Sequence, residues 1–280
     1  GNLIRTFKKE DFDADAIRTS MIGRELEGDY YRSDFIPSSQ QETALEAKNL
    51  CCGEQLKDVS VTLKKGEIVG VGGLSSCGMH ALGKAMFGAL ALESGNVLTG
   101  EGEAITTPHM AIEKKIGYVS KDRDVESLCL SASIKDNIAI AGMEQFAVGG
   151  HLITNANEKK YVRKQIQDLS IKCSDENQLT GQLSGGNKQK VVFGKWIGCG
   201  SEILILDCPT RGVDIGVKQA MYQLMIQLKK EGRAILLISE ELPELLGMSD
   251  RILIMKDGQI SHEFMRSENL TDADVIGYMI

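Results

Sequence analysis

A glycine-rich loop from Gly73 to Gly78 has the spacing of a phosphate-binding site. In such a loop, backbone N–H groups and the N-terminus of the following helix surround the phosphate oxygens with partial positive charge. The next two residues are Met79 and His80, where phosphate loops carry lysine and then serine or threonine. The stretch indicates either a nucleotide site that has lost part of its chemistry or a chance glycine turn. The residues predicted to contact a nucleotide here are Gly73, Leu74, Ser75, Ser76, Cys77, Gly78, Met79 and His80.

A second anion-binding pattern is the string LSGGNKQK at Leu183–Lys190. Ser184 is placed to cap the following helix, and the two glycines after it let an anion approach bare backbone amides at the positive end of the helix dipole. A capped helix after a flexible turn would explain the serine and the glycines, but not the whole string.

A carboxylate ends the apolar run ILILD, at Asp207. A carboxylate in this position can hold Mg²⁺ through its water shell beside phosphates. Any buried parallel strand can end in aspartate, so the run alone is a weak signal. It gains weight because it follows the LSGGN string and is itself followed by Asp214.

The elements that must position these residues are apolar strands alternating with helices. EIVGVGG and AILLIS have the pattern of buried strands, and the glycine loop leads from the first of these into a helix beginning near Met79. VKQAMYQLMIQLKKEG predicts an amphipathic helix closed by Gly232, and RILIMKDGQI predicts a hairpin through Asp257 and Gly258. Strands and helices in this order predict a parallel sheet covered on both faces.

The N-terminal part differs from the rest of the chain. Residues 11–22 have apolar residues at helical spacing, and Asp11 or Asp13 could cap that helix. Residues 23–42 are polar and contain Pro37, which indicates a linker. The chain begins with Gly-Asn and not with Met, so we expect a piece of a longer protein.

Composition restricts the classes of partner. The net charge of −7 over 280 residues disfavours nucleic acid as a partner. No apolar run approaches the roughly 20 residues that span a bilayer, so any membrane role requires a partner protein. The seven cysteines have no zinc-site spacing and are predicted to be reduced thiols.

The order of the motifs resembles that of an ATP-binding-cassette (ABC) nucleotide-binding domain: the glycine loop, GYVSKDR, LSGGN, ILILD, RGVD and LLISEELPE. LILDCPTRGVDIGVKQAMYQL and SEELPELLGMSDRILIMKDGQI are similar to the second cassette of ATP subunits of bacterial monosaccharide importers, which carry two cassettes in one polypeptide. LIRTFKKEDFDADAIRTSMIGREL is similar to the segment that joins the two. The resemblance implies an α/β P-loop NTPase fold with a RecA-like parallel-sheet core, an antiparallel β portion and a helical subdomain at about 131–181. It further implies that residues 1–42 are the tail of a preceding cassette and a linker, and that 43–280 form the nucleotide-binding domain.

The resemblance also implies cofactors and partners. In the family, two cassettes pair head to tail, and each ATP site combines the phosphate loop of one cassette with the signature of the other. For this chain the cofactors would be ATP and Mg²⁺, the ion held weakly at Asp207 or shared at the composite site. The partners would be the first cassette, a transmembrane permease and, indirectly, a sugar-binding protein, at the cytoplasmic face of the cell membrane. Asp214 would lie in the D-loop, and the signature facing the partner's ATP would be Leu183, Ser184, Gly185, Gly186 and Asn187.

Several positions depart from the family pattern. Met79 lacks the charge of the phosphate lysine, and the His80 imidazole suits Mg²⁺ poorly where a hydroxyl is usual. Cys208 stands at the catalytic-glutamate position, Lys121 at the Q-loop position and Glu240 at the switch-histidine position. Together they predict a degenerate phosphate loop (Walker A) beside an intact signature, hence a signature donor that hydrolyses ATP poorly alone. The alternatives are an active ABC ATPase for nucleoside or other small-solute uptake, and a soluble cassette of translation or DNA repair, which the acidic balance disfavours.

Overall fold

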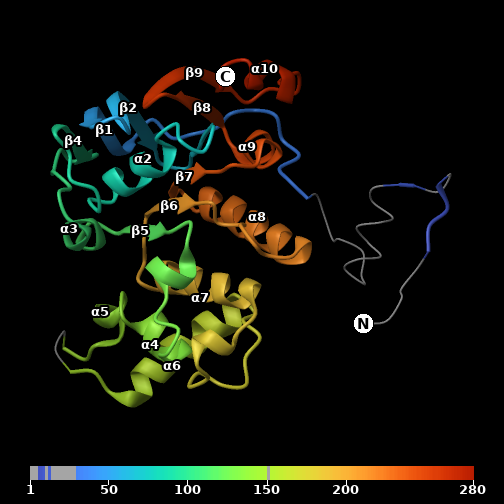
Figure 1. The fold of residues 1–280 in the computed structure, drawn as a ribbon. Coiled ribbons are helices and arrows are strands. Elements are labelled where there is room, and N and C mark those ends of the chain that lie inside the picture. The colour runs from blue at the N-terminus through green and yellow to red at the C-terminus, as the bar shows by residue number, and fades with distance from the viewer. Residues whose placement is uncertain (1–5, 10–11, 14–29, 150–151) are drawn as a thin grey trace.

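The computed structural model of the chain describes residues 6–9, 12–13, 30–149 and 152–280. Its core is a six-stranded sheet in the order β5-β6-β7-β3-β8-β9 (Figure 1). The first five strands run parallel, and β9 pairs antiparallel with β8. This arrangement confirms the predicted parallel core. The strands are β3 (Ile68–Gly73), β5 (Ile116–Val119), β6 (Ile203–Asp207), β7 (Ala234–Ile238), β8 (Arg251–Lys256) and β9 (Gln259–Met265).

The central strands are apolar because helices cover both of their faces. Every residue of β6 and β7 is buried, which is the pattern of a parallel strand inside an α/β protein. The predicted hairpin between β8 and β9 is also present. Asp257 and Gly258 both have positive φ, 49° and 83°, as the two-residue turns that match the twist of a hairpin require.

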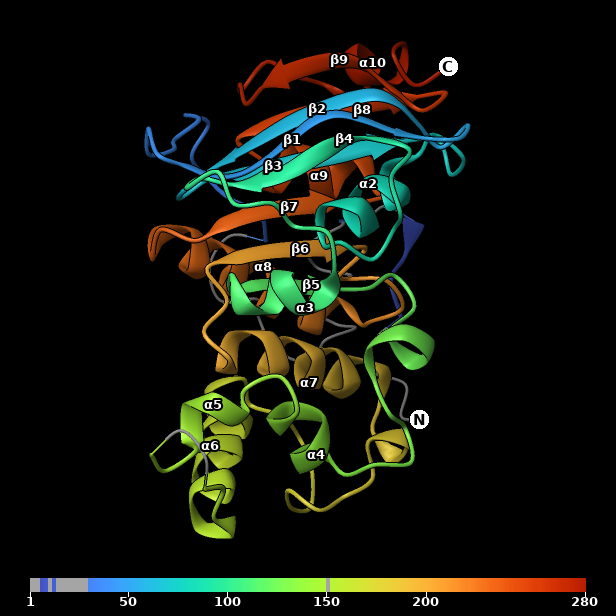
Figure 2. The same ribbon diagram turned by 90° about the vertical axis from the view of Figure 1, so that its left-hand side faces the viewer.

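A second, three-stranded sheet has the order β2-β1-β4 and is wholly antiparallel. It contains β1 (Thr43–Cys52), β2 (Leu56–Lys64) and β4 (Ser94–Thr99). Strand β2 contacts β9 and β7 of the larger sheet, and Figure 2 shows the small sheet beside β8 and β9. The predicted antiparallel portion near the start of the cassette is therefore confirmed.

Some helices lie on the two faces of the large sheet, and a separate group of helices lies beyond them (Figures 1 and 2). Helix α7 contacts β5 on one side and α4 and α6 on the other, and Figures 1 and 2 both show α4, α5 and α6 beyond α7. Among its described residues, the region predicted as helical contains α4, α5 and α6, whereas the domain boundaries remain a prediction. The helices are α2 (Met79–Met86), α3 (Pro108–Glu113), α4 (Ile134–Ala139), α5 (Met143–Phe146), α6 (Asn155–Asp168), α7 (Gly185–Gly198), α8 (Ile215–Lys230), α9 (Leu242–Met248) and α10 (Asp272–Ile276), with short helical turns at Arg123–Ser127 and Thr180–Gln182.

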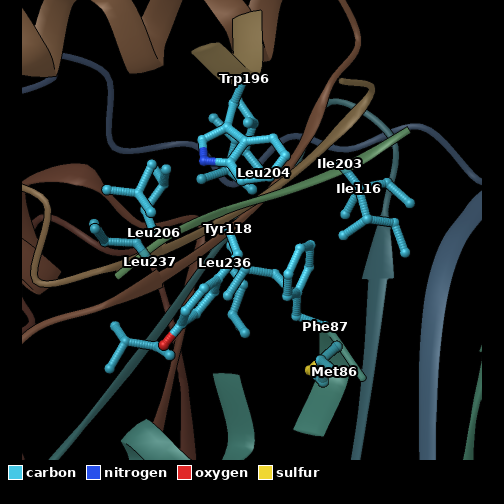
Figure 3. Close-up of a cluster of buried hydrophobic side chains, with 14 of the residues drawn as sticks. Met86, Phe87, Ile116, Tyr118, Trp196, Ile203, Leu204, Leu206, Leu236 and Leu237 are labelled. Atoms are coloured by element: carbon cyan, nitrogen blue, oxygen red, sulfur yellow. The ribbon is translucent and has the colours of Figure 1, made fainter. Parts of the chain in front are cut away.

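An aromatic cluster joins the three elements that surround the candidate site. Phe87, just after α2, stacks on Tyr118 of β5 with ring centroids 5.3 Å apart, and meets Trp196 of α7 edge-on at 5.8 Å. Figure 3 shows these rings among buried leucine and isoleucine side chains of β5, β6 and β7. The cluster fixes α2 and α7 relative to the sheet, and so fixes the side chains that these helices carry.

Residues 32–38 are fastened to the cassette by the buried carboxylate of Asp250. Its Oδ1 accepts from Arg32 Nη1 at 3.0 Å and from the backbone N–H of Ser38 at 3.0 Å, and lies 3.1 Å from Lys229 Nζ. Its Oδ2 accepts from the backbone N–H of Ile68 at 2.8 Å. One carboxylate therefore joins the linker, α8 and the start of β3.

The described part of the predicted linker, residues 30–42, contains neither helix nor strand, and its role as a linker remains a prediction. The predicted helix at 11–22 lies outside the described residues, apart from 12 and 13. In the described part of the chain, no helix has the length and apolar character needed to cross a membrane.

Candidate functional site

The glycine loop joins β3 to α2, as expected for a phosphate loop. Gly78 has φ 100° and immediately precedes α2, and a Cβ on it would lie 2.0 Å from the carbonyl oxygen of Gln55. A Cβ on Gly73 would lie 2.3 Å from the carbonyl oxygen of Met255. Only glycine fits at these two positions. Packing against neighbouring backbone therefore requires both glycines and explains their spacing.

The side chains of the loop supply no positive charge. Met79, at the position of the phosphate lysine, is fully buried in the core of the protein. Leu74, Ser75 and Ser76 are exposed, and Cys77 is buried. Any attraction for phosphate must therefore come from backbone amides, from the start of α2 or from other segments.

Four polar side chains meet at the carboxyl ends of neighbouring parallel strands, where α/β proteins bind their ligands. Asp207 ends β6, Lys121 follows β5, Glu240 follows β7, and His80 lies in the first turn of α2. His80 Nδ1 is 2.7 Å from Asp207 Oδ1, and Lys121 Nζ is 3.1 Å from His80 Nε2 and 2.7 Å from Glu240 Oε1. The structure thus brings together these four predicted positions in one network.

The protonation of His80 follows from its neighbours. A lysine ammonium only donates hydrogen bonds, so Nε2 of the imidazole accepts from Lys121. Nδ1 then carries the hydrogen and donates it to Asp207. The hydrogen bond from Lys121 also lowers the pKa of the Glu240 carboxyl, which stabilises its charged form.

Cys208 lies against this network but brings no usable charge. Its φ of 49° is the left-handed conformation, which L-residues other than asparagine and aspartate rarely adopt. Burial, followed by the negative charge of Asp207, raises the pKa of the thiol to about 12. At neutral pH the side chain is therefore an uncharged thiol, which cannot act as the carboxylate that polarises water.

The predicted Mg²⁺ site does not suit the ion. Mg²⁺ takes oxygen ligands in octahedral geometry, whereas here the usual hydroxyl is replaced by the imidazole of His80. Both oxygens of Asp207 already accept hydrogen bonds, Oδ1 from His80 and Oδ2 from the hydroxyl of Tyr118 at 3.2 Å. The carboxylate is 0% exposed, so it has no free oxygen facing solvent for the water shell of the ion.

The LSGGN signature forms the start of α7. Ser184 occupies the residue before the helix, but its side chain makes no capping bond to the backbone, so the predicted side-chain cap is wrong. The hydroxyl instead accepts from Asn187 Nδ2 at 3.0 Å, and Asn187 Oδ1 accepts from the backbone N–H of Lys172 at 2.8 Å. Asn187 holds the serine in place, and the serine side chain remains exposed.

Asp214 lies beside the signature and not beside the phosphate loop. Its side chain caps α8 by accepting from the backbone N–H of Val217 at 3.0 Å. Ser184, Asn187, Asp214 and Val217 line one groove of about 880 Å³. The predicted site residues therefore form two groups, the phosphate-loop network and the signature groove.

Two residues that the sequence did not single out connect these groups to the rest of the cassette. Tyr118 bonds Asp207, although its place in an apolar strand resembles that of an ordinary core residue. Arg123 donates to the carbonyl oxygen of Arg211 at 2.8 Å, and its Nη2 would lie 2.9 Å from a Cβ on Gly185. The sequence feature that could have identified Arg123 is its position two residues after Lys121, in the charged string VSKDR.

Lys195 gives α7 a pH-dependent stability. Its ammonium donates to the carbonyl oxygen of Ser127, and burial lowers its pKa to about 8 from 10.5. Between these values the unfolded chain binds a proton that the folded chain does not, so folding stability rises with pH. We expect the unfolding free energy to gain about 2 kcal/mol from about pH 8 to about pH 9.5 relative to Lys195→Met.

Urea unfolding of both proteins at the two pH values measures this difference. Other titrating groups contribute to both proteins and cancel in the comparison. An equal pH dependence in the parent and the variant would contradict the prediction.

The sheet order, the strand–loop–helix unit and the separate signature group together define a P-loop NTPase fold of the ABC-cassette type. A dimeric structure of a post-hydrolysis state of the ATP-binding cassette MJ0796 bound to ADP and Pi aligns with a TM-score of 0.68 at 19% identity, over 79% of this chain and 98% of that one. A nucleotide-free ATP-binding cassette from an ABC transporter aligns with a TM-score of 0.67 at 22% identity, over 85% and 99%. These similarities establish the fold.

Sequence similarity identifies the family. The profile of the ABC transporter family matches residues 56–211, more than half of the chain, so the chain belongs to this family and contains its ATP-binding domain. A ribose import ATP-binding protein of Bacillus subtilis is 40% identical over 96% of this chain and 54% of its own length. One of Lactococcus lactis subsp. cremoris is 39% identical over 99% and 55%. The chain spans about half the length of these curated relatives.

Proposed function

We propose that this chain is the second of two cassettes in the ATP-binding subunit of a bacterial monosaccharide importer. Its role is to donate Leu183–Asn187 to an ATP held by the phosphate loop of the first cassette, and to couple that site to the permease. The subunit acts at the cytoplasmic face of the membrane and receives sugar indirectly from a binding protein. The chain aligns with only about half the length of its relatives, which leaves room for a second cassette and supports a tandem arrangement. The names of these relatives make ribose the first sugar to test.

The observation that carries this proposal is the contrast between the two groups of site residues. The signature has its full LSGGN string, with Ser184 exposed and oriented by Asn187. The phosphate-loop site has a buried methionine for the phosphate cation and a neutral thiol for the carboxylate that polarises water. A cassette of this kind can complete a neighbour's ATP site although its own is degenerate.

We expect the chain by itself to hydrolyse ATP little above background, because Met79 and Cys208 remove the phosphate cation and the carboxylate together. Cys208→Glu alone should not restore turnover, since the cation is still missing and Lys121 remains paired with Glu240. Phosphate release at saturating ATP and Mg²⁺ measures both proteins. Turnover near one per second, within the usual range of enzymes, would instead support an independent ATPase.

A further inference from the structure

We infer that the phosphate loop of this chain binds nucleotide without Mg²⁺, as the metal-free nucleotide anion. The ammonium of Lys121 supplies the positive charge that faces the phosphates. This inference rests on the proposed function, in which the loop is a degenerate nucleotide site. It concerns the ligand that such a site binds.

Side chains of the protein fill the metal position. Asp207, the carboxylate that ends β6, is buried with both oxygens bonded, to His80 and to Tyr118. Water bound to Mg²⁺ would have to reach this buried carboxylate past His80 and Tyr118, in competition with the hydrogen bonds that they donate. Breaking bonds to a buried charged group is costly, so the internal network competes directly with the ion.

The donor atoms around Asp207 are also of the wrong kind for Mg²⁺. One ligand atom each from His80, Asp207 and Cys208 lies within 4.8 Å of the others. A nitrogen and a sulfur in such a group suit softer ions than Mg²⁺. The thiol, however, is uncharged at neutral pH, and the imidazole is bonded at both nitrogens. The group is therefore satisfied by internal bonds.

A phosphate also needs a positive charge. Lys121 Nζ has three hydrogens, of which His80 and Glu240 take two. The third is available to a phosphate oxygen, and the side chain is partly exposed beside His80, in the first turn of the helix that follows the loop. Lys84, in the same helix as His80, is instead directed to Glu126, 2.7 Å away. Lys121 is thus the cation placed to meet a phosphate chain.

Titration of the 280-residue chain with ATP, by calorimetry at millimolar ligand, tests the inference. The affinity in EDTA should be at least as high as in excess Mg²⁺, because the ion complexes ATP in solution and depletes the metal-free nucleotide, whereas a metal-dependent site loses about tenfold or more on removal of the ion. Affinity that falls tenfold in EDTA would overturn the inference. So would the absence of binding in both conditions, because the internal network would then exclude the nucleotide itself.

Variants separate the two cations. Lys121→Ala and Lys121→Gln should each weaken binding in EDTA by about tenfold or more, as expected for loss of a hydrogen bond to a charged group. Lys84→Ala, on α2 but directed away, should leave it unchanged. Equal effects of the substitutions at 121 and 84 would contradict the assignment of Lys121.

His80→Thr provides a test by gain of function. The threonine removes the bond from the imidazole to Asp207 Oδ1 and supplies the hydroxyl that Mg²⁺ prefers. Binding should then become about tenfold tighter with Mg²⁺ than in EDTA, and an unchanged ratio would overturn the argument that His80 fills the metal position. These titrations do not involve a second cassette, so the inference can fail while the signature-donor function stands.

Discussion

A full-length importer subunit that carries this chain as its second cassette should lose about tenfold to a hundredfold of its ATP turnover in the Ser184→Ala variant. The serine is exposed at the start of α7, and its hydroxyl is oriented by Asn187. Hydrogen bonds to charged groups contribute about 1.5–3 kcal/mol, which corresponds to this loss of rate if the bond is made to the γ-phosphate in the transition state. Steady-state phosphate release from the reconstituted importer measures the effect.

Gly185→Asp should reduce turnover at least as strongly. A Cβ at this position would lie 2.9 Å from Arg123 Nη2 and 3.1 Å from the carbonyl oxygen of Gly212, so the new side chain must displace one of them. In the proposed function, it would also place a negative charge against the ATP of the first cassette. Ser131→Ala, an exposed serine away from the groove, is the matched control and should retain full turnover. Parent-like turnover in both signature variants would contradict the proposed function.

Asp250→Ala should lower the free energy of unfolding by about 3–5 kcal/mol, because removing one partner of a buried ion pair leaves the charge of Lys229 without a carboxylate and leaves Arg32 with Asp34 alone. Arg32 and Lys229 would both lose their buried carboxylate, and the backbone N–H groups of Ser38 and Ile68 would lose their acceptor. Equilibrium urea unfolding measures the loss. Proteolysis within residues 30–42 should also become faster, since this segment loses the acceptor of its bonds from Arg32 and Ser38.

The matched control for this prediction is Asp272→Ala. Asp272 is an exposed aspartate in the first turn of α10, and its replacement should cost less than about 1 kcal/mol. A loss of similar size in both variants would mean that the buried network contributes no more than a surface charge.

The parts of the structure that the sequence predicted are those with local signals. The glycines of the phosphate loop, the Asp257-Gly258 turn and the apolar runs of β3, β6 and β7 each depend on neighbours in the chain. Their backbone requirements are visible in residue type and spacing, which is why the parallel core and the start of α2 were placed correctly.

The parts that it did not predict depend on contacts between distant segments. Arg32 and Asp250 are 218 residues apart, and neither stands in a pattern that names the other. Tyr118 has the apolar surroundings of a core residue, and only the approach of β6 reveals its bond to Asp207. Ser184 was expected to cap its helix, but the amide of Asn187 binds its hydroxyl instead. In each case the hydrogen bond that forms depends on which donors and acceptors the fold brings together from distant parts of the chain.

Backbone contacts maintain the conformation of the phosphate loop independently of the side chains that would act on phosphate. The carbonyl oxygen of Cys77 accepts from the N–H of Gly258 at 3.0 Å, and Gly78 packs closely against Gln55, so the loop is held by two turns that bind no phosphate. Mutation at Gly78 is therefore opposed by backbone packing, whereas His80 is held by side-chain bonds to Asp207 and Lys121. The glycines of this loop can thus be retained for folding alone, so their spacing in a sequence is not by itself a record of phosphate chemistry.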